Sequence, residues 1–153
     1  MQGDRKPVPF LRSEFNESLG QPSPNSHWMA YTSDKSGQPE VYVRPFPSGE
    51  GETRISIAGG EQPRWREDGK ELFFVGGDGK MTVVAVKAVA GTKRSFEAGS
   101  LQPLFEAHLI QSPANLLLQY DVTADGKRFL LATTAGGSAS LTVVVNWDAA
   151  LKK

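Results

Sequence analysis

The sequence repeats one hairpin phrase three times, and this repeat limits the folds open to the chain more than any other feature. The phrase reads WREDGKELFFV at residues 65–75, VTADGKRFLLA at 122–132 and PSPNSHWMAYT at 22–32. An Asp-Gly pair between a short extended run and an apolar run predicts a tight hairpin turn, since both residues accept a positive φ. In the first copy Asn25-Ser26 replaces Asp-Gly, and because Ser26 carries a Cβ we expect a different turn there.

The three turns mark the same point in three successive units. Asn25, Asp68 and Asp125 are 43 and 57 residues apart, and a period of about 40–45 residues with four strands is typical of a β-propeller blade. An irregular insert near residues 89–115, which begins with an irregular connection at 89–100, is expected to account for the longer interval. The blades are predicted at residues 20–57, 60–106 and 116–147, followed by a C-terminal tail at 148–153.

The predicted fold is all-β, because no apolar period of 3.6 residues persists for three turns. The segment VPFLR, which begins at Val8 and ends at Arg12, predicts one further strand, whereas the third blade ends without an outer strand. We therefore expect the N-terminal strand to complete the last blade. This gives three four-stranded blades and removes two exposed sheet edges.

Three blades are too few for a closed ring, since propellers typically have four to eight. Two copies of the chain would supply six. We therefore predict a homodimer in which residues 8–12 of each chain complete the last blade of the partner. The alternative is that the chain is a piece of a longer propeller.

The repeat also carries a family resemblance. The stretch SPNSHWMAYTSDKSGQPEVYVRPFP resembles the repeat S-P-D-G-(K/R)-x-(I/L)-A-(F/Y)-x-S-D-x-x-G of TolB-like, WD-repeat-like β-propellers, and the two later units resemble further copies. The likeness covers nearly the whole chain, and is greatest to C-terminal propeller segments behind bacterial kinase or transcription-regulator domains. It implies six blades, a periplasmic or other extracytoplasmic location, and a binding scaffold without catalytic activity.

Composition argues against several classes of partner. Lys and Arg together number 17, as do Asp and Glu, so the formal net charge is zero and no basic surplus points to nucleic acid. No apolar run is long enough to span a membrane, and the N-terminal stretch MQGDRKPVPFLRSEF lacks the apolar core of a signal peptide. The absence of cysteine excludes disulfides and thiolate metal sites.

The sequence offers no catalytic or cofactor motif. Only two histidines occur, His27 beside a turn and His108 in a connection, and no G-x-S-x-G is present. The aspartates form no calcium-binding loop, and the glycine-rich stretches precede no helix that would hold a phosphate. We expect no enzymatic activity, no metal and no cofactor.

Binding is the function that remains. Polar residues at or near the starts of the inner strands are predicted to line a central channel and to bind a peptide or a small polar ligand: Gln21, Glu61, Gln62, Arg64 and Gln119. Trp28, Trp65 and Trp147 are expected to pack between blades, with an aromatic binding surface as the alternative. We predict a non-catalytic scaffold for an unidentified protein or ligand, or else a sensor or accessory piece of a larger kinase, regulator or peptidase-type protein.

Overall fold

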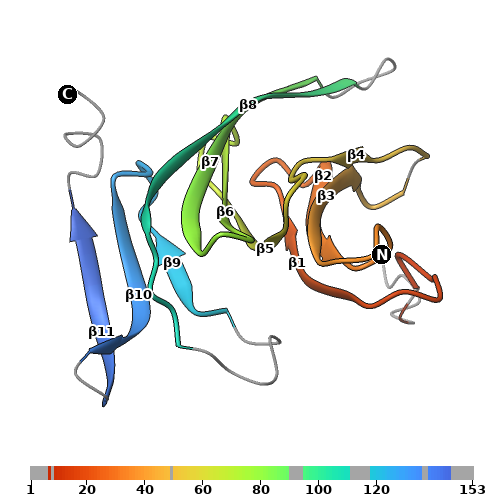
Figure 1. Cartoon of the computed structure of the whole chain (residues 1–153). Helices are drawn as coiled ribbons and strands as arrows, with labels where there is room; N and C mark the ends of the chain where they lie inside the picture. Colours follow the sequence, from red (N-terminus) through yellow and green to blue (C-terminus); the bar gives the residue numbers. More distant parts are fainter. Residues whose placement is uncertain are drawn as a thin grey trace.

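The computed structural model describes residue 7 and residues 9–48, 50–89, 95–110, 118–135 and 138–145. Its regular elements are all β-strands, arranged in three antiparallel sheets. Figure 1 shows the sheets side by side in chain order, with the first and third at opposite ends. None of the described residues belongs to a helix that could cross a membrane.

The first sheet has four strands in chain order: β1 (Glu17–Pro22), β2 (Trp28–Ser33), β3 (Glu40–Pro45) and β4 (Thr53–Arg54). The outer strand β4 is only two residues long, and a buried carboxylate holds this part of the chain in place. Glu40 is fully buried, and it accepts hydrogen bonds from Arg54 at 2.6 Å, from the Gly59 amide at 3.1 Å and from Ser56.

The second sheet also has four strands in chain order: β5 (Gly60–Trp65), β6 (Glu71–Gly76), β7 (Lys80–Val89) and β8 (Ser95–Glu106). The expectation of an irregular connection over residues 89–100 is wrong at Val89 and over residues 95–100, because β7 and β8 are paired out to Val89 and Ser95, and residues 90–94 lie outside the described part. Hydrogen bonds between the strands therefore compensate for the polar, Gly-containing composition of this stretch.

The third sheet has three strands in the order β11 (Ser138–Val145), β10 (Arg128–Ala135) and β9 (Tyr120–Val122). The expected N-terminal strand is absent from the described residues, since residues 9–12 are not in a strand and Val8 lies outside the described part. Phe10 instead packs edge-on against Phe46 at 5.4 Å, beside the first sheet. The predicted C-terminal tail, residues 148–153, also lies outside the described residues.

The three hairpins confirm the repeat, but their turn differs from the one expected. Gly69 donates to the Arg66 carbonyl, as Gly126 does to Thr123 and Ser26 does to Ser23. Only the last residue of each turn has a positive φ, at 70°, 73° and 56° respectively. The expectation that both Asp and Gly take positive φ is therefore wrong.

The first hairpin uses the same turn as the other two, so the expectation of a different turn there is also wrong. Asn25 makes the same contact as the aspartate of the other two turns, because its side-chain oxygen accepts from the backbone N–H of His27. In those turns the aspartate accepts from the backbone N–H two residues later, Lys70 for Asp68 and Lys127 for Asp125. These side-chain contacts support the turn even where Ser26 must adopt a left-handed conformation.

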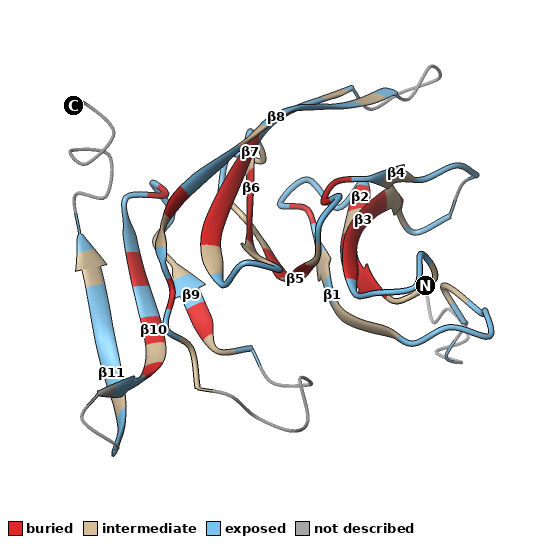
Figure 2. Cartoon of the chain, viewed as in Figure 1, coloured by how far each residue is buried: buried red, intermediate tan, exposed pale blue. Residues whose placement is uncertain are grey.

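The core lies between the sheets, and the second sheet contributes to both halves of it. On one face Leu72, Phe74 and Val84 pack with Trp28 and Val43 of the first sheet. The opposite face packs on the third sheet through residues that include Phe73, Met81, Tyr120, Phe129 and Leu131. Figure 2 shows the resulting contrast between the buried strands β2, β3, β6 and β7 and the largely exposed β11.

Candidate binding site

The residues predicted to line a channel lie on or beside the inner strands β1, β5 and β9. In both β1 and β5 the pairing with the next strand shifts at a bulge, where Leu19 and Gln62 have φ of 55° and 58°. Gln119 occupies the matching place before β9, four residues ahead of its turn. Bulges re-aim the side chains of a strand, so they determine where these candidate residues point.

Gln62 and Gln119 meet across the boundary between the second and third sheets. The backbone N–H of Gln119 donates to the side-chain oxygen of Gln62 at 2.7 Å. In return, the side-chain nitrogen of Gln62 donates to the side-chain oxygen of Gln119 at 3.3 Å. Tyr120 completes the contact by donating to the Gln62 carbonyl at 2.8 Å. Because Gln62 is only 4% exposed, its amide serves mainly to join two inner strands.

The other three predicted residues are more dispersed. The Gln21 carbonyl accepts from the Trp65 indole at 3.0 Å, which links the first and second sheets. Arg64 lies 3.8 Å from the Asp121 carboxylate, and its Nε has no hydrogen-bond partner among the described residues. Glu61 is half-buried near the start of β5. Ligand binding by the five residues stays a prediction.

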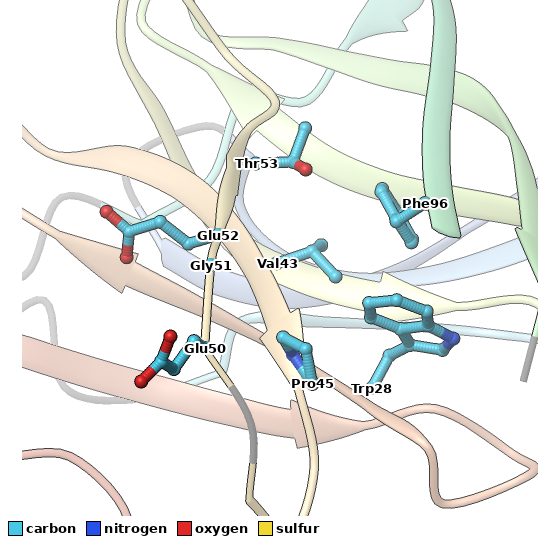
Figure 3. A pocket seen from close by; sticks show the side chains of 8 residues that line it. All are labelled: Trp28, Val43, Pro45, Glu50, Gly51, Glu52, Thr53 and Phe96. Carbon is cyan, nitrogen blue, oxygen red and sulfur yellow. The ribbon is translucent and has the colours of Figure 1, made fainter. Parts of the chain in front are cut away.

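A hollow between the first and second sheets was not anticipated from the sequence. It has a volume of about 320 Å³ and is lined by Trp28, Val43, Pro45, Glu50, Gly51, Glu52, Thr53 and Phe96. Figure 3 shows the carboxylates of Glu50 and Glu52 directed away from Trp28 and Phe96, so the wall beside the aromatic rings is apolar. We refer to this hollow as the seam pocket.

Two structural features create the seam pocket. The pairing of β3 with β4 ends at Val43 and Thr53, so β4 does not extend alongside Pro45. On the other side, the β7–β8 hairpin continues past the body of the second sheet and carries Phe96 to within 5.1 Å of Trp28, ring to ring. Phe96 was missed from the sequence because it lies in the stretch expected to be irregular.

A second, larger hollow adjoins the seam pocket through a shared wall. It has a volume of about 640 Å³, and its lining includes the turn residues Ser23 and Asp68 together with Trp28, Trp65 and Val86. Trp28 therefore borders both hollows. It is only 4% exposed, and its indole nitrogen is buried without a hydrogen-bond partner among the described residues.

The described residues do not gather three or more His, Asp or Glu side chains into a group that could hold a metal ion. His27 is exposed next to the first turn, and His108 is exposed with a φ of 45°. Of the three tryptophans, Trp28 and Trp65 pack between sheets as expected, and Trp147 lies outside the described residues.

Comparison with known proteins identifies the fold alone. No family model matches the chain, and no curated protein does. TolB from Acinetobacter baumannii superposes with a TM-score of 0.58 at 18% identity, over 82% of this chain and 29% of that one. A putative 6-phosphogluconolactonase from Bacteroides uniformis reaches 0.49 at 17% identity, over 88% of this chain and 42% of the other. The chain thus has a fold similar to that of TolB, and it spans less than a third of the TolB chain.

Proposed function

We propose that the protein is a non-catalytic β-propeller scaffold that closes into a six-bladed ring with a second copy of itself. Each chain contributes three blades, and residues 8–12 of each add the missing strand to the partner's third sheet. The proposal rests on one observation, that among the described residues the third sheet has three strands where the other two have four. The resemblance to TolB-like repeats supports an extracytoplasmic location.

The open edge of β11 has the properties of a strand-pairing site. In the first two sheets the third strand is covered by β4 or β8, whereas no described strand lies on the outer side of β11. The eight residues SASLTVVV carry no charge and no proline. Long apolar edges without charge favour pairing with another strand, so this edge is suited to accept one.

The face of the third sheet that points away from the second sheet is also uncovered. Register pairs Leu130 with Val143 and Ala132 with Leu141, which places all four on one face. Leu130 is 44% exposed, Leu141 75% and Val143 60%. In a propeller the next blade would cover this face, and burial of such residues favours association by about 25 cal/mol per Å².

The position of the N-terminal segment favours exchange between chains. Phe10 contacts Phe46, and the Arg44 guanidinium lies 5.3 Å from the Phe10 ring, so the segment belongs with the first sheet. The open edge of β11 lies in the sheet at the opposite end of the molecule (Figure 1). A strand from this segment therefore reaches β11 most directly from a second chain.

Light scattering on a sizing column, over a range of dilutions, tests the ring. We expect twice the 16.6 kDa mass of one chain, and a monomer when residues 1–12 are deleted. A well-folded monomer of the full chain at every concentration would refute the dimer.

A second candidate function is a sensor or accessory segment of a larger protein. The observation that favours it is the match to only 29% of the TolB chain, since further blades of the same polypeptide would then cover β11. The parent reading frame decides between the two, because a kinase, regulator or peptidase domain in it favours the accessory role.

The inner-strand residues are part of the proposed scaffold as a site for a peptide or small polar ligand. Arg64 is the best place to test this, because Gln62 and Gln119 hold the sheets together and their loss would disturb the fold. We expect Arg64→Ala to weaken the binding of a ligand identified by pull-down without lowering the unfolding midpoint. Unchanged affinity in this variant would remove Arg64 from the site.

A further inference from the structure

We propose that the exposed face of the third sheet docks on the outward face of the first sheet of a second copy, with Leu130 entering a hollow beside Met29 and Tyr31. The outward face of a sheet is the one that points away from the second sheet. The inference rests on the proposed ring and deepens it by naming the receiving surface and the residues that meet there. The packing of the first sheet on the second within one chain is the template, because the sheets are copies of one unit.

The shared turns and the strand register give each position of the first sheet its equivalent in the third. Asn25 and Asp125 hold the same position in their turns and are 100 residues apart, so residues of β2 and β10 correspond at that spacing. The register of each hairpin extends the correspondence to β3 and β11. The equivalent pairs are Ala30 with Leu130, Thr32 with Ala132, Val41 with Leu141 and Val43 with Val143.

These equivalent positions are buried in the first sheet and exposed in the third. Ala30, Val41 and Val43 are at most 1% exposed, because they belong to the core between the first and second sheets. Leu141 and Val143 are 75% and 60% exposed. The third sheet therefore presents the same face that packs on the following sheet elsewhere in the chain, but among the described residues nothing covers it.

The receiving surface is identified by the same equivalence. In the second sheet, Leu72 and Phe74 belong to the core shared with the first sheet. The turns of the first two hairpins are 43 residues apart, so the equivalents in the first sheet are Met29 and Tyr31. Because Ala30 between them faces the second sheet and side chains alternate along a strand, both lie on the outward face. The first and third sheets lie at opposite ends of the molecule (Figure 1), so a second copy must supply one of the two faces.

A hollow of about 300 Å³ lies on this part of the outward face. In the template the side chain that meets the receiving sheet at this position is the small Ala30, whereas its equivalent Leu130 is larger and needs more room. The hollow supplies that room at the position where the register places Leu130. The apolar part of its lining is formed by Phe10, Leu11, Leu19, Met29 and Tyr31.

The polar groups of the receiving face are already paired within the first sheet. The Tyr31 hydroxyl donates to Glu52 at 2.7 Å, and Glu52 also forms an ion pair with Lys35. The Lys35 ammonium lies 3.7 Å from the centre of the Tyr42 ring. Because these groups have partners, an aliphatic surface can cover them without leaving them unpaired, which lowers the cost of burying them.

One pair of positions adds complementary charge to the docking. Arg128 is the equivalent of Trp28 and is exposed. Glu52 precedes β4 at the position that Leu101 holds on β8, and Leu101 packs against the core that contains Trp28. The docking therefore brings an arginine and a glutamate to opposite sides of an interface whose template is apolar at both positions. Opposite charges across an interface favour the correct partner and register.

Engineered cysteines test the docking in the full chain, which has no cysteine of its own. The double variant Met29→Cys with Leu130→Cys is treated with a short bis-maleimide and separated on a denaturing gel. We expect a covalent dimer from the double variant and none from either single variant, because the interface joins residue 29 of one copy to residue 130 of the other. Val89→Cys with Leu130→Cys is the matched control and should give no covalent dimer, since Val89 is an exposed residue of the second sheet.

Leu130→Ala tests the use of the hollow. Burial of a leucine side chain favours association, so we expect the variant to raise the dissociation constant of the dimer by about tenfold or more. Light scattering over a range of dilutions measures this constant. Val89→Ala, which removes a similar exposed side chain outside both docking faces, should leave it unchanged. An unchanged constant in Leu130→Ala would overturn the proposal.

The cross-linking results separate the docking from the ring. A dimer that gives no cross-link in the double variant would overturn the docking and leave self-association standing. A dimer that cross-links through Leu130→Cys alone would also overturn it, because two third sheets would then face each other. Cross-linked species larger than a dimer would support the docking and refute the closed ring of two copies. A monomer at every concentration would refute both.

Discussion

The first and third sheets, at the two ends of the molecule, differ in how exposed their outward face is, that is, the face that points away from the second sheet. On the first sheet this face is closed, since Tyr31 and Tyr42 are stacked with ring centroids 5.9 Å apart and are only 3% and 5% exposed. Lys35 lies 3.7 Å from the Tyr42 ring and pairs with Glu52. On the third sheet Leu141 and Val143 are exposed on the equivalent face. The edge of this sheet at β11 also has no described outer strand beside it.

The difference shows that the same repeat can form a sheet with a fourth strand and a buried outward face, or a sheet in which neither is present among the described residues. The first sheet has its fourth strand, and the far face is covered by charged and aromatic side chains that interact with one another. Among the described residues the third sheet has neither, and it is held by the second sheet and by the segment after β8, where Leu109 bridges to Thr133 and the Ile110 amide donates to the Ala132 carbonyl. Exposed apolar patches of this kind mark interaction sites, and in the proposed ring this face would pack against the far face of the first sheet of the second copy.

The largest expected effect comes from opening the first sheet. Glu40→Ala removes the buried carboxylate that joins β3 to Arg54, Ser56 and the Gly59 amide. Removing one member of a buried charged network costs about 3 kcal/mol, which urea unfolding can measure. Glu97→Ala, at an exposed site on β8, is the control and should change stability by less than about 0.5 kcal/mol. A loss under 1 kcal/mol at Glu40 would show that β4 is held by other contacts.

The same carboxylate predicts how stability depends on acid. Burial alone would raise the pKa of Glu40, but hydrogen bonds led by those from Ser56 and Gln38 lower it below its ordinary value of 4.5. A lowered folded-state pKa contributes stability that is present above pH 4.5 and is lost as the pH falls toward the folded-state value. The unfolding free energy of wild type should therefore drop more steeply below pH 4.5 than that of Glu40→Gln. Parallel curves would contradict this.

The next effect compares turns of the second and third sheets. Gly126→Ala forces a Cβ onto φ of 73° and to within 3.1 Å of the Phe73 ring, whereas at Gly69 the nearest atom is 3.8 Å away, on Pro24. We expect thermal unfolding to show a loss of about 2 kcal/mol for Gly126→Ala and about 1 kcal/mol for Gly69→Ala. Equal losses would mean that the third hairpin has room to adjust.

A smaller gain is expected at the matching turn of the first sheet. Ser26 holds φ of 56° with a Cβ present, so Ser26→Gly removes strain and should stabilise the protein by about 0.5–1 kcal/mol. Chemical denaturation measures the change. A loss of stability would show that Ser26 contributes contacts that outweigh its backbone strain.

The smallest effect on stability, but the clearest on association, is expected on the open face. Leu141→Lys with Val143→Lys places two charges on exposed positions, so the unfolding free energy of the isolated chain should change by less than about 0.5 kcal/mol. Light scattering should then find a monomer. Ile57→Lys, at a residue 73% exposed outside this face, serves as the control and should leave the mass unchanged. A persistent dimer in the double variant would place the interface elsewhere.

Much of the fold could be predicted from local sequence. The phrases around Asp68 and Asp125 indicated hairpins because side-chain and backbone hydrogen bonds within a few residues specify them, and all three turns share those bonds. The turn type was misjudged because positive φ was assigned to both turn residues when only the last one adopts it. The stretch containing Phe96 was misread because its strand character depends on pairing with β7, which short-range propensity does not report.

The candidate sites were less predictable than the fold. Gln62 and Gln119 were recognised as polar residues on inner strands, but their mutual hydrogen bonds join residues 57 positions apart. No local pattern encodes that meeting. The seam pocket was not foreseen for the same reason, since Trp28 and Phe96 come from different sheets and meet only because a long hairpin extends between them.

By itself the sequence determined the all-β class, the three hairpin units and the deficit of one outer strand, because each depends on residue types within a few positions of one another. The tertiary structure alone decided which faces are covered, where the N-terminal segment rests and which aromatic rings enclose a pocket. These depend on the packing of sheets against each other, where alternate residues of one strand contact different neighbours. That packing depends on residues far apart in the chain, and on the third sheet one face with Leu141 and Val143 stays exposed.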